Sequence, residues 1–279
     1  MITRTATIVA RMAVFVAAIA TLASMARAAD ERTIEVATRP GQKVRALLII
    51  PDKPRASVIL LAGGHGNLML SGTGHIGWGA GNQLVRTRAA YAQAGYATLV
   101  PDIAPDLKRP NGGVDGYRWS AQHAADIGAL IAHMRGIAEP VYLIGTSRAA
   151  LSVANAAVRT KGREQPDAIV ITSGLLMHAK EGAPSVETKV PGFAGIRQPT
   201  LLVAHKDDGC VMSPAASAPL FKARLKSAER VDVRILTGGS GGSGDPCEAK
   251  SPHGFIGIDQ VVVRTISDWL AALPQPAKP

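Results

Sequence analysis

The stretch from Val141 to Ala150 constrains the fold more than any other part of the chain. Its first four residues are apolar and β-prone, and they pass directly into Gly145-Thr146-Ser147-Arg148-Ala149 and an alanine-rich helical pattern. This order predicts a buried strand that turns sharply into a helix, with Ser147 at the apex. A serine in that position projects its hydroxyl out of the sheet, and the N–H of the next residue points into the same space.

Continuous apolar runs alternate with helical patterns along most of the chain. The predicted strands cover residues 57–62, 97–100, 141–144, 168–172, 200–204 and 231–236, and the predicted helices cover 84–92, 119–134, 150–158, 213–225 and 262–270. Unbroken apolar strands separated by helices are typical of an α/β protein whose mostly parallel sheet is covered on both faces. Two earlier strands, 33–36 and 44–50, flank the turn sequence Arg39-Pro40-Gly41 and predict an antiparallel hairpin at one edge.

The N-terminus predicts a segment that is removed from the mature protein. Arg4 and Arg11 precede the apolar run 12–20, and Ala26-Arg27-Ala28 follows it. A positive start, a short apolar core and an Ala-x-Ala site describe a secretory signal peptide. The alternative, a membrane anchor, would require a longer apolar run. We therefore expect residues 1–28 to be a signal peptide and 29–279 to form a single domain, with 274–279 frayed, in a periplasmic or secreted protein without a stable membrane anchor.

Charge and cysteine content narrow the class of protein further. Removing residues 1–28 leaves 251 of the 279 residues and lowers the formal net charge from +10 to +7. The remaining basic residues are scattered, with no arginine-rich helix and no aromatic platform between lysines, which argues against nucleic-acid binding. Cys210 and Cys247 suit an oxidising compartment and predict a disulfide, because a pair without Cys-x-x-Cys spacing is a poor zinc site. No pattern in the sequence indicates an oligomeric state.

Three polar residues follow strands in the order Ser147, Asp208 and His253. A serine needs a base, an orienting acid and anion stabilisation before it becomes a good nucleophile. All three residues would lie at the carboxyl ends of parallel strands, where open α/β sheets place their sites. Asp207 is adjacent to Asp208 and is the alternative acid, while Asp102 follows a strand before the serine and is interpreted as a loop or pocket residue.

The chain resembles the α/β-hydrolase superfamily over nearly the whole of residues 29–279. The resemblance rests on Gly145-Thr146-Ser147-Arg148-Ala149, on Gly63-Gly64-His65-Gly66, on the Asp208 loop and on Pro252-His253-Gly254 before the last helix. Ala149 is a departure, since the family most often has glycine there. The serine also differs from dienelactone hydrolases, which usually carry cysteine as the nucleophile.

The resemblance implies a role for each of these residues. Ser147 would be the nucleophile, His253 the base, and Asp208 the acid that orients the histidine. The oxyanion hole would use the N–H of Arg148 and an N–H from Gly64 or His65. Asp208 is preferred to Asp207 because it stands three residues before Val211, and because Ser213-Pro214 resembles a helix N-cap followed by proline at the first helical position.

The residues close to the proposed catalytic residues in the sequence allow two interpretations each. His65, His75 and Trp78 would line the substrate pocket, or their glycine-rich loop would only pack over the sheet edge. A metal site at His65 and His75 lacks a nearby acidic partner, so we expect no metal. A bridge from Cys210 to Cys247 would tie the Asp208 loop to the His253 loop, or would be a general structural crosslink without effect on activity.

The expected activity is cleavage of a small ester-like substrate through an acyl-serine intermediate, without a cofactor. The short irregular segment 177–198 leaves no room for a large lid domain, which favours a carboxylesterase or a dienelactone-hydrolase-like enzyme over a lipase. A peptidase or an acyltransferase would fit the same fold. A protein of another class, a non-catalytic binding module that keeps the pocket, is the second hypothesis.

Overall fold

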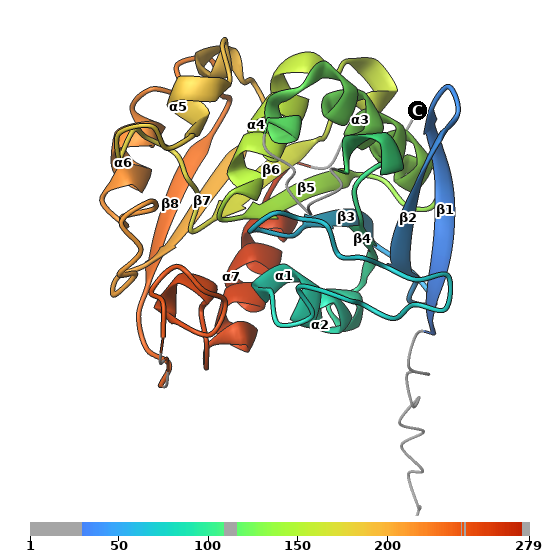
Figure 1. The fold of residues 1–279 in the computed structure, drawn as a ribbon, viewed down its shortest axis with the longest axis horizontal. Coiled ribbons are helices and arrows are strands. Elements are labelled where there is room, and N and C mark those ends of the chain that lie inside the picture. Colours follow the sequence, from blue (N-terminus) through green and yellow to red (C-terminus); the bar gives the residue numbers. More distant parts are fainter. Residues whose placement is uncertain (1–29, 109–115, 241, 243, 275–279) are drawn as a thin grey trace, which may run out of the picture.

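The computed structural model describes residues 30–108, 116–240, 242 and 244–274. The predicted signal peptide and most of the predicted frayed end, 275–279, lie outside the described residues. Within them, eight strands form one sheet in the order β1-β2-β4-β3-β5-β6-β7-β8 (Figure 1). The strands are β1 (Glu31–Arg39), β2 (Gln42–Ile49), β3 (Ala56–Leu61), β4 (Tyr96–Pro101), β5 (Val141–Thr146), β6 (Ala168–Thr172), β7 (Thr200–His205) and β8 (Val231–Leu236).

The sheet is mostly parallel, as the unbroken apolar runs predict. β1 pairs antiparallel with β2, and β2 pairs antiparallel with β4, while every neighbouring pair from β4 to β8 is parallel. The predicted hairpin is therefore confirmed, and it forms one edge of the sheet. Since β3, β5 and β7 run in the same direction, the loops that follow them emerge at the same end of the strands, the carboxyl end.

Helices cover both faces of the sheet (Figure 1). The helices are α1 (Gln83–Arg86), α2 (Arg88–Gln93), α3 (Ala121–Arg135), α4 (Ala149–Arg159), α5 (Val186–Lys189), α6 (Ser217–Lys222) and α7 (Asp259–Ala271). α3, α4, α5 and α6 pack on one face, around a core that includes Ile127, Leu151 and Phe221. α1, α2 and α7 pack on the other, around Leu84, Tyr91 and Ile266. Each such fully buried side chain contributes about 1.5–3 kcal/mol.

Two of the predicted helices before β5 differ from the observed ones. The predicted helix 84–92 is divided into α1 and α2 at Thr87, whose hydroxyl donates a hydrogen bond to the Gln83 carbonyl at 2.7 Å and so competes with the regular ladder. The predicted helix from 119 begins later, at α3, because the Ser120 side chain caps it by accepting from the His123 N–H. Trp119 belongs instead to a short 3₁₀ turn, η2 (Tyr117–Trp119).

The segment between β6 and β7 contains only short elements. They are α5 and the 3₁₀ turn η4 (Phe193–Gly195), so no large lid domain is inserted there, as predicted. In the described part of the chain, no helix has the length and apolar character needed to span a membrane.

Candidate active site

Ser147 lies at the sharp turn between β5 and α4. Its φ of +56° is in the left-handed region, and its N–H donates to the carbonyl oxygen of Thr172 on β6 at 2.8 Å. A side chain at Gly145 would begin 2.6 Å from Val153 Cγ2 and 2.9 Å from the Ala149 carbonyl oxygen, so only glycine allows α4 to return so close to β5. The backbone therefore adopts the strained strand-to-helix turn that the sequence predicts.

Asp208 and His253 come together from two separate loops. Asp208 Oδ2 lies 2.9 Å from His253 Nδ1, and both side chains are almost completely buried. The other carboxylate oxygen, Oδ1, accepts the backbone N–H of Cys210 at 2.9 Å. Asp207, the alternative acid, is exposed, and its backbone N–H donates to His205 Nδ1. Asp208 is therefore the aspartate whose carboxylate reaches the histidine.

Ser213 has a place that the sequence did not predict. The predicted N-cap is wrong, since α6 begins only at Ser217, after Ala216. Ser213 Oγ instead lies 2.9 Å from His253 Nδ1 and donates to Asp208 Oδ2 at 3.2 Å. A hydroxyl thus bridges the acid and the imidazole, and it adds a second hydrogen bond to the same carboxylate oxygen.

The second ring nitrogen of His253 is available for chemistry. Nε2 is buried and makes no hydrogen bond to any described residue. His253 is held by the 3₁₀ turn η5 (Pro252–Gly254), in which Ser251 Oγ accepts the His253 N–H at 3.2 Å. The next residue must be glycine, because a side chain at Gly254 would begin 2.1 Å from the Ala249 carbonyl oxygen. Backbone and ring are both fixed, while Nε2 keeps its lone pair or proton for another partner.

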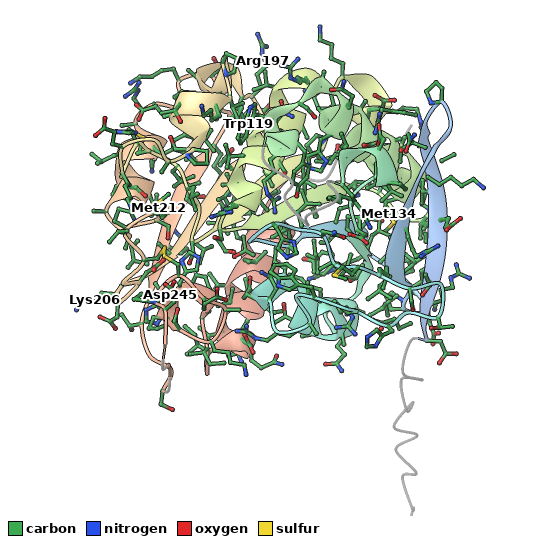
Figure 2. The ribbon with its side chains drawn as sticks, viewed as in Figure 1. Trp119, Met134, Arg197, Lys206, Met212 and Asp245 are labelled. Atoms are coloured by element: carbon green, nitrogen blue, oxygen red, sulfur yellow. A yellow bond between two sulfur atoms is a disulfide. The ribbon has the colours of Figure 1, made fainter. Side chains whose placement is uncertain are left out.

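A disulfide joins the two loops that carry Asp208 and His253. Cys210 and Cys247 are bonded, as expected, across 37 positions of sequence. Figure 2 labels Met212 and Asp245, one from each of these loops. A side chain at Gly209 would begin 3.3 Å from Pro246 Cβ, so the loops also touch beside the crosslink.

The loop that follows β3 packs directly against Ser147. A side chain at Gly63 would begin 3.0 Å from Ser147 Cβ. Within the part of the chain that the structure describes, the backbone N–H groups of Gly64, His65 and Arg148 donate to no protein acceptor. Three donors near the serine are therefore free, including those that the family resemblance assigns to an oxyanion hole.

The predicted pocket residues separate into two groups. His65 stacks on Trp78, with ring centroids 3.6 Å apart, next to Gly64. Burial lowers the pKa of His65, and the cations Arg118 and Arg148 lower it further, so the ring is neutral at pH 7. His75 is exposed in a turn whose Gly74 lies against β1 and β2, and among the described residues it makes no ring contact with the other two.

The possible metal ligands near the site fit the histidine–acid pair better than an ion. Among the described residues, Asp208, Cys210 and His253 have ligand atoms within 4.8 Å of one another. The Cys210 sulfur is in the disulfide, so it cannot supply a thiolate.

Comparisons with known proteins identify the fold. A scan of the chain against protein-family models finds no match, and a search of curated proteins finds no similar sequence. Solved structures do match. The esterase of Pyrococcus furiosus has a TM-score of 0.61 at 13% identity, and the match covers 87% of this chain and 91% of the esterase.

Two other matches have similar extents. The dienelactone hydrolase of Anabaena variabilis has a TM-score of 0.58 at 17% identity, covering 88% of this chain and 98% of that one. Carboxyl esterase 2 of Tuber melanosporum has a TM-score of 0.57 at 15% identity, covering 92% and 90%. The chain therefore has the α/β-hydrolase fold.

Proposed function

We propose that this protein is a serine hydrolase that cleaves ester bonds in small molecules through a Ser147–His253–Asp208 triad. The observation that carries the proposal is the buried hydrogen bond from His253 Nδ1 to Asp208 Oδ2, which leaves Nε2 without a partner. Ser147 Oγ, at the strained turn after β5, is the partner that Nε2 would take. Catalytic hydrogen bonds of this kind are often completed only when substrate binds.

The proposed reaction has two half-reactions. Ser147 Oγ forms a bond to the ester carbonyl carbon as its proton moves to His253 Nε2, and the carbonyl oxygen becomes an oxyanion. The carbon–oxygen bond to the alcohol then breaks, and the alcohol takes the proton from Nε2. Water attacks the acyl-serine, His253 accepts its proton, and release of the carboxylic acid returns a proton to Ser147.

Each neighbour of the pair has a distinct part in this mechanism. Asp208 accepts from Nδ1–H, so it fixes the tautomer that leaves Nε2 as the base and stabilises the cationic ring. Ser213 supports the same carboxylate. The free N–H groups of Arg148 and of Gly64 or His65 would stabilise the oxyanion, and loss of one such donor lowers the rate by roughly 100- to 1000-fold.

Covalent labelling tests the proposal directly. A fluorophosphonate should label the wild-type protein once, at Ser147, and Ser147→Ala should abolish both the labelling and the hydrolysis of a chromogenic ester. Ser173→Ala is a matched control, because Ser173 is buried at the end of β6 and also has a positive φ. An unlabelled wild-type protein would instead support the non-catalytic binding module.

We also propose that the protein is exported and acts in the periplasm or outside the cell. The signal-peptide pattern at residues 1–28 and the Cys210–Cys247 disulfide support this, because disulfides persist in oxidising compartments. Expression of the full chain in a bacterium should yield a periplasmic or secreted form whose N-terminal sequence begins after Ala28. A mature protein that stays in the cytoplasm with its first residues intact would contradict export.

A further inference from the structure

Four consecutive carbonyl oxygens, those of residues 62–65, are bound by two adjacent side chains of η2. Arg118 binds the first three and Tyr117 binds the fourth. The distances are 2.9, 3.3 and 3.0 Å from Arg118 Nη2 to the oxygens of Ala62, Gly63 and Gly64, and 3.1 Å from Tyr117 Oη to the oxygen of His65. We call this arrangement the carbonyl clamp.

Arg118 is an unusual residue to find in this position, because it is 5% exposed and pairs with no carboxylate among the described residues. Its other terminal nitrogen, Nη1, donates to the neutral Ser152 Oγ at 2.9 Å. A buried cation without a counter-charge costs several kcal/mol unless its donors are well satisfied. Here neutral oxygens satisfy them, so the carbonyl clamp is what stabilises the charge.

Clamped carbonyls determine where the N–H groups of the same peptides point. In a planar trans peptide the C=O of one residue and the N–H of the next point in opposite directions. Arg118 holds the oxygens of Gly63 and Gly64, so the N–H groups of Gly64 and His65 point away from Arg118. These are two of the free donors near Ser147, against whose Cβ Gly63 packs.

The clamp is also tied to the helix that carries the catalytic serine. Ser152 lies on α4, and its Oγ lies 3.0 Å from His123 Nε2 on α3. Burial lowers the pKa of His123 to about 3, so the ring is neutral where it meets Ser152. Ser152 Oγ accepts from Arg118 and is also hydrogen-bonded to this neutral ring. The same guanidinium therefore contacts both the loop after β3 and the helix that follows Ser147.

The structure assigns to Arg118, with Tyr117, the role of a positioning element that orients the oxyanion-hole donors of Gly64 and His65 relative to Ser147. This inference rests on the proposed function and adds two residues to it. Neither residue is expected to touch the substrate.

The test compares Arg118→Lys and Tyr117→Phe with wild type, using kcat per active site titrated with a fluorophosphonate. Lysine keeps the charge but cannot span several carbonyl oxygens, so kcat should fall about 100-fold, as for a small displacement of catalytic groups, with little change in KM. Tyr117→Phe removes one neutral hydrogen bond, worth about 1 kcal/mol, and kcat should fall about fivefold. Affinity for a trifluoromethyl ketone, which forms an oxyanion on the serine, should fall by the same factors.

Arg135→Lys is the matched control. Arg135 also binds backbone carbonyls, those of Arg163 and Gln165, but it lies at the opposite ends of the strands, near Asp167. It should lower the melting temperature without changing kcat per active site. A purely structural role for Arg118 predicts that same behaviour, so unchanged kcat and ketone affinity in the folded variants overturns the inference.

Different results would contradict the proposed function and the positioning role of Arg118. A wild-type protein without esterase activity or labelling overturns the proposed function. An active wild type with unaffected variants overturns only the positioning role. If Arg118→Lys does not fold, Tyr117→Phe decides alone, because it removes one hydroxyl and keeps the ring.

Discussion

The two sides of Ser147 are held in place by different physical means. On the acid–base side, Asp208 and His253 come from loops 45 positions apart and are joined by a charge-assisted hydrogen bond and a disulfide. On the other side, the loop after β3 has no covalent tie. The carbonyl clamp holds it, with hydrogen bonds between a buried cation and neutral oxygens.

The difference follows from how each side is built. The loop of residues 62–65 continues directly from a central strand, so its path is short and only its peptide orientations need control. The His253 loop follows the edge strand β8 and a glycine- and serine-rich stretch at 238–244. A long loop of that composition has high conformational entropy, which a crosslink reduces. The covalent restraint is thus found on the side whose loop carries the glycine- and serine-rich sequence.

The largest effect should come from the acid–base side. Asp208→Asn keeps the shape but disfavours the histidine tautomer that leaves Nε2 as the base, so kcat should fall about 10⁴-fold. Asp207→Asn, at an exposed neighbour, should leave kcat unchanged. Steady-state kinetics on one chromogenic ester measures both. A larger loss in Asp207→Asn would reverse the assignment of the acid.

Removing the disulfide should have the next largest effect. For a loop of 37 positions, Cys210→Ser combined with Cys247→Ser should lower the free energy of unfolding by about 4 kcal/mol, measured by urea denaturation. Reduction of the wild type by dithiothreitol should also lower turnover before the domain unfolds. If a fully reduced, still folded enzyme keeps its turnover, the bridge is only a general crosslink.

On the clamp side, Gly66→Ala should lower kcat about 100-fold by displacing the loop. At φ +75° the new Cβ would lie 2.4 Å from Tyr117 Oη and 2.5 Å from Arg118 Nη2. Gly72→Ala, in the same glycine-rich loop, has no atom within 4 Å of the new Cβ and should behave as wild type. Equal activity of the two variants would mean that the clamp tolerates displacement.

The smallest effect concerns the stability of the folded protein at acid pH, which depends on His123 beside the clamp. The pKa of His123 is lowered to about 3 in the folded state, whereas in the unfolded chain it is about 6.5. Between these values the unfolded state binds more protons, so stability falls as pH drops through this window. From pH 6.5 to 5 the loss is about 2 kcal/mol. His123→Asn should remove this part of the pH dependence in urea unfolding, and exchange of the exposed His75 should not.

Much of the fold and part of the site could be predicted because local residue type encodes them. Apolar runs mark the strands, and the small residues around Ser147 mark the turn after β5. Arg118 could not be found in this way, because it binds backbone oxygens, which every residue at 62–65 would supply. The sequence predicts a helix cap at Ser213, because no local pattern relates this residue to His253, 40 positions away. The path of the loop that carries His75 could not be predicted from the sequence either.

The carbonyl clamp has a consequence for how substrate preference could change. It binds only main-chain atoms of residues 62–65, so the His65 ring takes no part in the clamp and is held instead by the Asn67 N–H, which donates to its Nδ1 at 3.1 Å. The ring also packs against Trp78, and under the proposed function it would form part of the wall beside the serine. Under the proposed function, replacements at position 65 would therefore change the acyl or alcohol groups that are accepted while the clamp on the main chain stays in place. The main chain of this loop and its side chains thus have separable roles.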